Sequence, residues 1–286
     1  MKIRDIIARG EPMLSFEVFP PKTEDKYDSV ERAAREIAKL KPAFMSVTYG
    51  AGGGTSKYTV DIAVAVKEMG VTPLAHLTCV TSTREKVQSV IDDLKAHGIE
   101  NVLALRGDIP KDGRVEKDYR HAVDLIAELK AKNPDLCIGG ACYVEGHVES
   151  ANKAEDIKYL KEKVDAGLDF VTTQLFFDNN AYFNFLYRIR EQGITVPVLA
   201  GIMPITKAVQ LDRSVSMSGS SIPARFRALV DRFGDNPAAM KQAGIAYATD
   251  QIIDLIANQV NGIHVYSMNQ PDVAAKIQAN LSEIIR

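Results

Sequence analysis

The sequence lacks tryptophan altogether, and only three of its 286 residues are cysteine. Three cysteines, Cys79, Cys137 and Cys142, are too few and too odd in number for a disulfide framework, so we expect a protein of the reducing cytoplasm. Charge of one sign is also missing: 35 basic and 37 acidic residues leave a net charge of −2, which argues against binding to nucleic acid. Hydrophobic runs are too short to span a bilayer, and charges near Met1 interrupt any signal-peptide core, so we expect no membrane association.

The chain instead has the composition of an ordinary globular protein, with 46% hydrophobic and 25% charged residues. Strand-like and helix-like segments alternate along it with a short period. We predict strands at residues 13–19, 44–48, 73–80, 101–105, 137–143, 170–175, 196–202 and 263–267. We predict helices at residues 28–40, 57–69, 83–97, 117–132, 154–166, 180–192 and 273–285, with a broken helical region over 207–260.

Eight such units without a flexible linker predict an α/β protein with a parallel sheet. Because eight parallel strands close into a barrel, we expect a single (β/α)₈ barrel over residues 1–286, with extra helices before the last strand. A doubly wound open sheet is the alternative. In a barrel the chemistry lies at the carboxyl ends of the strands, and the predicted strand ends are unusually polar.

Three of these strand ends carry candidate functional groups. Glu17 lies among apolar residues of the first strand, where a carboxyl group is costly unless it is paired and is suited to general acid catalysis. The alternative is a glutamate that reaches solvent past Pro20 and Pro21. Arg106 and Asp108 end the fourth strand, where they could anchor a phosphate and a heterocycle, or simply pair with each other. His76 is either a site residue or a core histidine.

Other motifs do not fit standard sites. The glycine-rich segment 50–54 departs from the dinucleotide-binding fingerprint at Thr55, and no phosphate-binding GK[ST] follows it. The cysteine and histidine spacing matches no metal site, so we expect none. Asp156 and Lys163 fall on a charged helix that is also typical of a solvated face.

Taken together, the ordered motifs of this sequence resemble those of the methylenetetrahydrofolate reductase family. The resemblance extends from Leu14 to about Asn269. It rests on SFEVFPP (15–21), SVTYG (46–50), HLTC (76–79), LRGD (105–108), KVDAG (163–167), TQ (173–174), FFD (176–178), GIMP (201–204) and VYSMN (265–269).

The resemblance implies an FAD-dependent oxidoreductase that reduces 5,10-methylenetetrahydrofolate to 5-methyltetrahydrofolate in a ping-pong reaction, with NADH or NADPH as reductant and with a homo-oligomeric state. By position, Glu17 matches the general acid, and Asp108 matches a residue next to both flavin and folate. Gln174, Gln210 and Gln270 match folate-contact positions. The positions that match FAD contacts are Thr48, Tyr49, Ala51, His76, Arg106, Gly107, Asp108, Ala122, Tyr143, His147, Asp156 and Lys163.

The sequence departs from the family at three positions. Gln270 stands where the family often has arginine, Ser214 where it has phenylalanine, and Val144 where it has proline. Because the first two changes fall in the region of folate and donor binding, a second hypothesis is that a partner flavoprotein or iron–sulfur subunit delivers the electrons. A third hypothesis is a noncatalytic barrel subunit, although the joint presence of Glu17, Asp108 and Gln174 argues against it.

Overall fold

Eight parallel strands form a closed barrel in the computed structural model, which describes residues 1–21, 23–49, 56–110, 113 and 115–285. Each strand pairs with the next, and the first strand also pairs with the last, Glu17 lying opposite both Ser46 and Tyr266. The prediction of a (β/α)₈ barrel is therefore confirmed, and the doubly wound sheet is wrong. The strands are β1 (Met13–Val18), β2 (Met45–Val47), β3 (Pro73–Thr78), β4 (Asn101–Leu105), β5 (Cys137–Cys142), β6 (Phe170–Thr173), β7 (Val198–Ile202) and β8 (Gly262–Tyr266).

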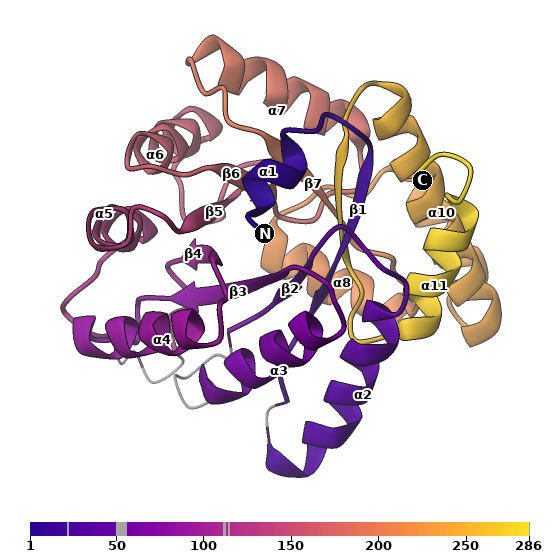
Figure 1. Cartoon of the computed structure of the whole chain (residues 1–286). Helices are drawn as coiled ribbons and strands as arrows, with labels where there is room; N and C mark the ends of the chain where they lie inside the picture. Colours follow the sequence, from indigo (N-terminus) through magenta and orange to yellow (C-terminus); the bar gives the residue numbers. More distant parts are fainter. Residues whose placement is uncertain (22, 50–55, 111–112, 114, 286) are drawn as a thin grey trace.

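Helices surround this ring of strands, as Figure 1 shows. Those of the first half are α1 (Ile3–Ile7), a short 3₁₀ helix (Glu24–Lys26), α2 (Tyr27–Ala38), α3 (Ser56–Glu68), α4 (Arg84–Ala96) and α5 (Ala122–Lys132). The second half adds α6 (Lys153–Asp165), α7 (Asn179–Glu191), α8 (Ala208–Ser218), α9 (Ala224–Phe233), α10 (Pro237–Ala257) and α11 (Pro271–Asn280). Three helices, α8, α9 and α10, lie between β7 and β8, where a regular βα unit has one, so the expected extra helices before the last strand are present.

The strands alternate between two environments, as pleated strands must. Phe16, Val47 and Leu77 face outward and join the large core between strands and helices. Met13, Leu74 and the other members of a second cluster face the barrel axis at its amino-terminal end. Glu17 lies on the same face of β1 as Met13, so its side chain is directed to the axis nearer the opposite end.

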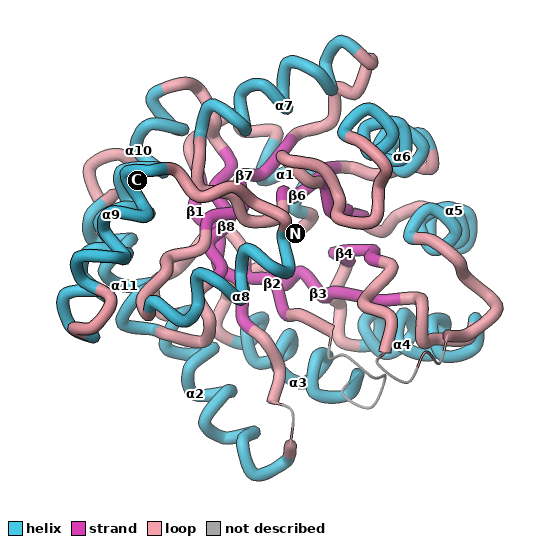
Figure 2. Tube along the Cα trace, turned by 180° about the vertical axis from the view of Figure 1, so that it is seen from behind, coloured by secondary structure: helices cyan, strands magenta, loops and turns pink. Residues whose placement is uncertain are grey.

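The amino-terminal end of the barrel is covered by α1, which the sequence analysis did not predict. Ile3 is fully buried in the axial apolar cluster, and its backbone N–H donates to Asn101 Oδ1 at 2.8 Å. Arg4 pairs with Asp169 at 2.9 Å. Figure 1 shows α1 over the centre of the ring, whereas the view from behind in Figure 2 shows α8 crossing the opposite side. The axis is therefore closed at the end away from the expected site.

One predicted helix start is wrong. The helix expected over 117–132 begins only at Ala122, because the Asp124 carboxylate accepts hydrogen bonds from the backbone N–H groups of Arg120 and His121. These two N–H groups have no partner within the helix, and the carboxylate pairs with both of them. The pairing fixes the start of α5 at Ala122.

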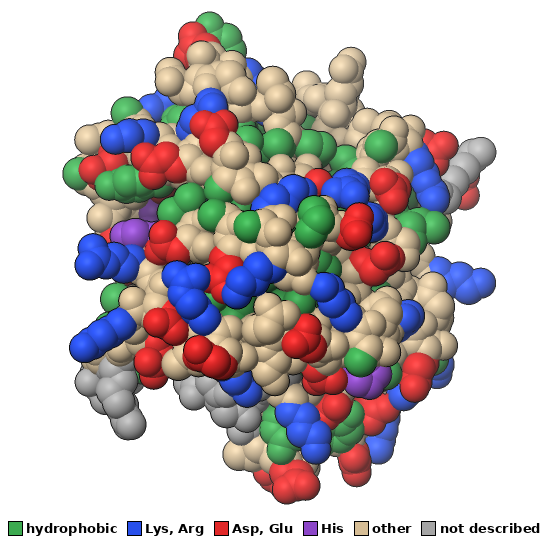
Figure 3. Space-filling view, turned by 60° about the vertical axis from the view of Figure 1, so that its left-hand side comes forward, with side chains coloured by type: hydrophobic (Ala, Val, Ile, Leu, Met, Phe, Trp, Pro, Cys, Tyr) green, Lys and Arg blue, Asp and Glu red, His purple; other side chains and the backbone are tan. Residues whose placement is uncertain are grey.

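The surface carries charges of both signs. Figure 3 shows acidic and basic side chains interspersed over one face. Among the residues that the structure describes, no helix is both long and apolar enough to cross a bilayer.

Candidate active site

A pocket of about 700 Å³ lies at the carboxyl ends of the strands and reaches down into the barrel. Its deepest lining residues, Leu74, Leu103 and His264, belong to the axial face of the strands. The pocket brings together most of the residues that the sequence singled out. These are Glu17, Thr48, Tyr49, His76, Arg106, Gly107, Asp108, Ala122, Tyr143, His147, Asp156, Lys163 and Gln174.

Glu17 lies at the floor of this pocket, near the end of β1. Its side chain is 20% exposed, so the carboxyl group is held inside the barrel but still accessible from the pocket. Glu17 Oε2 lies 3.4 Å from Ser46 Oγ, 3.5 Å from His76 Nε2 and 4.0 Å from His264 Nε2. The alternative of a glutamate turned outward past the two prolines is therefore excluded.

His76 faces the same space from β3. Burial lowers the pKa of its imidazole to about 4, an effect that the nearby Glu17 carboxylate only partly opposes. The ring is therefore neutral at physiological pH. Its Nε2 atom is buried and has no hydrogen-bond partner among the described residues, so a polar group at that position in the pocket remains unsatisfied.

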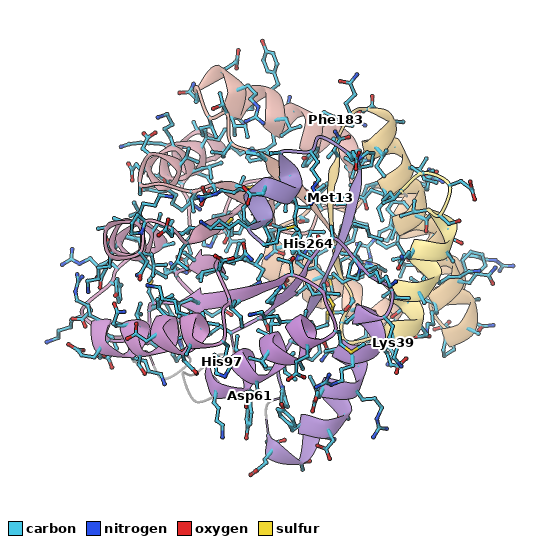
Figure 4. The ribbon with its side chains drawn as sticks, in the orientation of Figure 1. Met13, Lys39, Asp61, His97, Phe183 and His264 are labelled. Carbon is cyan, nitrogen blue, oxygen red and sulfur yellow. The ribbon has the colours of Figure 1, made fainter. Side chains whose placement is uncertain are left out.

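A buried polar cluster lies directly beneath Glu17. Ser15 Oγ is 2.8 Å from His264 Nδ1 and donates to the Ile263 carbonyl at 3.0 Å. Ser46 Oγ is 3.1 Å from His264 Nε2. Ser15, Ser46 and His264 are all buried, and Figure 4 shows His264 near the centre of the ring of strands.

The opposite wall of the pocket carries two cations and two anions. Arg106 makes a bidentate pair with Glu149, at 2.5 and 2.9 Å, and this hydrogen bonding lowers the pKa of the Glu149 carboxyl. The Lys163 ammonium group donates to the Ala141 carbonyl at 2.6 Å, and burial lowers the pKa of Lys163. Burial raises the pKa of Asp156, which accepts a hydrogen bond from Ser150 at 3.3 Å.

Gly107 and Asp108 form the rim after β4. The φ angle of Gly107 is +86°, a conformation that favours glycine, and a Cβ atom there would lie 2.8 Å from Thr78 Cβ. The backbone therefore approaches β3 as closely as a glycine permits. Asp108 is exposed at the pocket edge, and Arg106 pairs with Glu149 rather than with it, so the predicted alternative of an Arg106–Asp108 pair does not form.

Two predicted site residues, Gln210 and Gln270, do not line the pocket, and a third falls where the structure gives no description. Ala51 lies outside the described residues. Gln210 Oε1 accepts from Thr206 N, Thr206 Oγ1 and Lys207 N, so this side chain caps the start of α8. Gln270 precedes α11 and makes no side-chain capping bond there. The roles of these residues stay predictions.

Two polar residues below the pocket, Ser46 and His264, were not predicted from the sequence, although period-two alternation was a usable signal. Residues 264 and 266 lie on one face of β8, and Tyr266 donates to the Thr173 carbonyl at 2.5 Å. The sequence predicts polar groups at the strand tips, where the chemistry of a barrel lies. Polar side chains also lie two residues before those tips, at Ser46 on β2 and His264 on β8.

The three cysteines are buried free thiols, and burial raises the pKa of both Cys79 and Cys142 to about 12. The thiolate is the reactive form of cysteine, and a raised pKa keeps the thiol protonated. These cysteines are therefore unreactive core residues. Among the described residues, no three histidine, cysteine or acidic side chains are grouped so as to hold a metal ion.

The pocket contains a carboxyl group on the barrel axis above buried histidines, and its walls carry cationic and anionic side chains. These features are those of an active site in a barrel enzyme. Residues 2–282 match the family model described as methylenetetrahydrofolate reductase. The chain is 34% identical over 270 residues to 5,10-methylenetetrahydrofolate reductase of Pectobacterium carotovorum, covering 94% of this chain and 90% of the relative. The chain therefore belongs to the methylenetetrahydrofolate reductase family.

Other relatives are longer. The chain is 35% identical over 298 residues to methylenetetrahydrofolate reductase (NADH) 1 of Arabidopsis thaliana, covering 99% of this chain but 50% of that protein. It thus spans about half the length of the plant relatives that it matches.

A solved structure supports the fold independently. It is an uncharacterized Clostridium thermocellum protein described as binding two copies of 5-methyl-5,6,7,8-tetrahydrofolic acid. The two chains align with a TM-score of 0.66 and 14% identity, over 99% of each. At that identity the likeness shows only the shared architecture.

Proposed function

We propose that this chain reduces 5,10-methylenetetrahydrofolate to 5-methyltetrahydrofolate with bound FAD, in a ping-pong reaction that draws electrons from NADH or NADPH. The observation that carries the proposal is the Glu17 carboxyl group at the floor of a pocket that Asp108 and Gln174 also line, in a member of this family. The proposal includes a single barrel domain over residues 1–286 that works as a homo-oligomer in the cytoplasm.

The pocket suits FAD in size and in chemistry. Its volume of about 700 Å³ is within the range of small-molecule sites. The unsatisfied Nε2 atom of His76 faces into it, and Arg106 and Lys163 would hold the pyrophosphate. Thr48, Tyr49, Gly107, Ala122, Tyr143, His147 and Asp156 would complete the contacts. When bound, FAD supplies the hydride chemistry, while the protein orients the reactants and sets the electrostatics.

Glu17 would hold a proton at its carboxyl group and deliver it to the nitrogen of the folate five-membered ring. The C–N bond then breaks, the nitrogen retains the proton, and the ring opens to an iminium cation. Glu17 suits this step because it is accessible from the pocket yet surrounded by barrel side chains.

Asp108 and Gln174 would bind and stabilise the folate. The Asp108 carboxylate at the pocket edge places a negative charge where the iminium cation forms. Gln174 Oε1 accepts from Leu175 N at 2.9 Å, which fixes the side chain and leaves the amide N–H groups as donors to the ligand. Gln210 would contact the folate only when its side chain leaves the start of α8, and Gln270 only when its side chain reaches the pocket.

A second candidate keeps the same folate reduction but takes electrons from a partner flavoprotein or iron–sulfur subunit. It is favoured by the uncharged Gln270, two residues after the pocket-lining Met268, and by Ser214, which is buried and donates to Met203 Sδ at 3.5 Å. The third, a noncatalytic barrel subunit, would be colourless and would fail to take up FAD.

The test begins with the purified protein. We expect a yellow protein with the absorbance of an oxidised flavin, or a colourless one that becomes yellow with added FAD. Under anaerobic conditions the reduced flavin should then be reoxidised by 5,10-methylenetetrahydrofolate. A protein that takes up no FAD would refute the proposal and support the noncatalytic subunit.

A further inference from the structure

A hydrogen-bonded chain runs from Glu17 into the closed part of the barrel. Glu17 Oε2 contacts Ser46 Oγ at 3.4 Å, and Ser46 Oγ contacts His264 Nε2 at 3.1 Å. His264 Nδ1 contacts Ser15 Oγ at 2.8 Å, and Ser15 Oγ reaches the Ile263 carbonyl at 3.0 Å. The three residues below Glu17 are at most 2% exposed, so water does not compete for these contacts.

The last member of the chain fixes the direction of the hydrogen bonds at Ser15. A backbone carbonyl can only accept, so Ser15 donates to Ile263 and its oxygen accepts the N–H of His264 Nδ1. A neutral imidazole that carries its proton on Nδ1 has a lone pair on Nε2, which accepts the Ser46 hydroxyl proton. Ser46 then presents a lone pair to Glu17, and this last contact is satisfied only by a protonated carboxyl group.

Ionisation of Glu17 breaks this pattern. If Ser46 turns to donate to the carboxylate, His264 Nε2 loses its donor and needs a proton of its own. Every group in the chain is therefore satisfied only when Glu17 and His264 hold one proton between them. Two arrangements meet that condition, and the neutral one costs less to bury than a carboxylate–imidazolium pair, so the shared proton stays on Glu17.

The other titratable groups that face Glu17 add no positive charge. His76, on β3, is neutral because burial lowers its pKa to about 4. Tyr266, on β8, is also neutral because burial raises its pKa well above the usual value, and its hydroxyl group donates to Thr173. Of the two histidines near Glu17, His264 is the one that the hydrogen-bonded chain connects to it through Ser46.

We propose that His264 and Ser46 are positioning residues that hold the catalytic proton on Glu17, an inference that rests on the proposed folate reduction. When Glu17 gives its proton to the folate nitrogen, Ser46 turns its hydroxyl group toward the new carboxylate. His264 Nε2 is then left without a donor. A proton taken up from water through the exposed edge of Glu17 restores the acid form and returns Ser46 to His264.

The first test uses the ligand-free protein and does not depend on activity. The chain has five histidines, so ¹⁵N-histidine labelling gives few signals, and His264→Gln identifies the one from His264. Across a pH titration, the Nε2 signal of His264 should move when Glu17 loses its proton, because Ser46 then turns away from His264. In Glu17→Gln, whose amide N–H group donates to Ser46 at every pH, that signal should stay at its low-pH position.

Ser46→Ala gives a second variant for this measurement, because it removes the hydrogen-bonded link and leaves only the direct 4.0 Å approach between the two groups. The His264 signal should then no longer follow Glu17. Identical pH titrations of His264 in the unmodified protein, Glu17→Gln and Ser46→Ala would overturn the inference.

The second test is kinetic. Ser46→Ala should slow reoxidation of the reduced flavin by folate about tenfold at neutral pH, while flavin reduction stays within about twofold. The pH at which the folate step falls to half should move to lower values, and Ser46→Thr, which keeps the hydroxyl group, should restore it. Thr249→Val is a matched control, because it removes a buried hydroxyl group that donates to Ile245 on α10, outside the pocket.

These outcomes separate the two proposals. If the unmodified protein reduces folate but Ser46→Ala leaves its pH profile unchanged, this inference fails alone. If the unmodified protein binds no FAD or reduces no folate, the proposed function fails, and the histidine titrations still decide whether Glu17 and His264 share a proton.

Discussion

At the scale of single residues, Glu17 should act in only one half of the reaction. Glu17→Gln keeps the size of the side chain and its contact with Ser46 but removes the transferable proton. We expect flavin reduction to stay within about twofold and the folate step to slow by about 10² to 10⁴, the usual contribution of general acid catalysis. Anaerobic stopped-flow absorbance, with the two half-reactions mixed separately, measures both rates.

Asp108→Asn provides the comparison for that variant. Asp108 acts through its charge and donates no proton, so the folate step should slow less than in Glu17→Gln. An equal loss of both half-reactions in Glu17→Gln would instead mean that Glu17 maintains the pocket or holds the cofactor.

The buried His76 should make the fold sensitive to mild acid. Its folded-state pKa of about 4 lies below the unfolded value of about 6.5, so the unfolded chain binds this proton first as the pH falls. Stability from the neutral ring is complete above about pH 6.5 and is lost as the pH falls toward 4, with about 2 kcal/mol lost by pH 5. Urea denaturation at pH 7 and at pH 5 measures the loss, which should be much smaller in His76→Gln.

His97 serves as the matched control. It lies at the end of α4 with a side chain that is 46% exposed, at the periphery of the molecule in Figure 4. His97→Gln should leave the pH dependence of unfolding almost unchanged. A His76→Gln protein with the same acid sensitivity as the unmodified one would show that other groups cause it.

At the scale of elements, the packing of α10 depends on Gly244. A Cβ atom at this position would collide with the carbonyl oxygen of Ile205, in the loop after β7. Alanine is favoured over glycine in a helix by about 1 kcal/mol, so helix propensity alone predicts that Gly244→Ala stabilises the protein. We expect a net loss of about 2 kcal/mol instead, because the collision involves backbone that cannot move aside.

Ala246→Gly isolates the propensity effect on the same helix. Ala246 is exposed, so this change should cost about 1 kcal/mol and nothing more. Chemical denaturation of both variants gives the two free energies. If Gly244→Ala were as stable as the unmodified protein or more so, α10 would have room to shift away from the loop.

The elements themselves were largely predictable, because hydrophobic periodicity depends only on neighbouring residues. Strand β4 has the predicted bounds, and the bounds of α3, α4, α6 and α7 differ from the prediction by one residue at each end. The errors have tertiary causes. The Asp124 carboxylate delays the start of α5, and α1 is five residues long, too short for a periodic signal, and is held by Asn101 and Asp169.

At the scale of the whole molecule, barrel closure explains which parts of the site the sequence predicts. Once eight strands are assigned, alternation directs Glu17, His76 and Gln174 to the axis, and the pocket contains all three. The hydrogen-bonded chain below them could not be predicted in the same way. Ser46 and His264 are neighbours only because β1 pairs with both β2 and β8, a contact that forms when the ring closes.

The electron donor also depends on the molecule as a whole, through the charge at the pocket mouth. Arg106 at the pocket is paired with Glu149, and Gln270, two residues after the pocket-lining Met268, adds no charge, so this side of the site offers little attraction for an anionic donor or folate tail. Gln270→Arg should therefore lower the KM for an anionic ligand about fivefold with little change in kcat, the effect of about 1 kcal/mol from one charge pair in water. Steady-state kinetics at low ionic strength, varying donor and folate in turn, measures this change.

Gln242→Arg is the matched control, because it adds the same charge to an exposed position on α10 outside the pocket lining. Equal effects of the two variants would mean that net charge, rather than a local contact, attracts the ligand. The identity of the donor is decided in the unmodified protein, where NADH or NADPH should bleach the bound flavin under anaerobic mixing. If both fail while reduced ferredoxin succeeds, a partner protein supplies the electrons, and position 270 needs no positive charge because no dinucleotide has to be held near it.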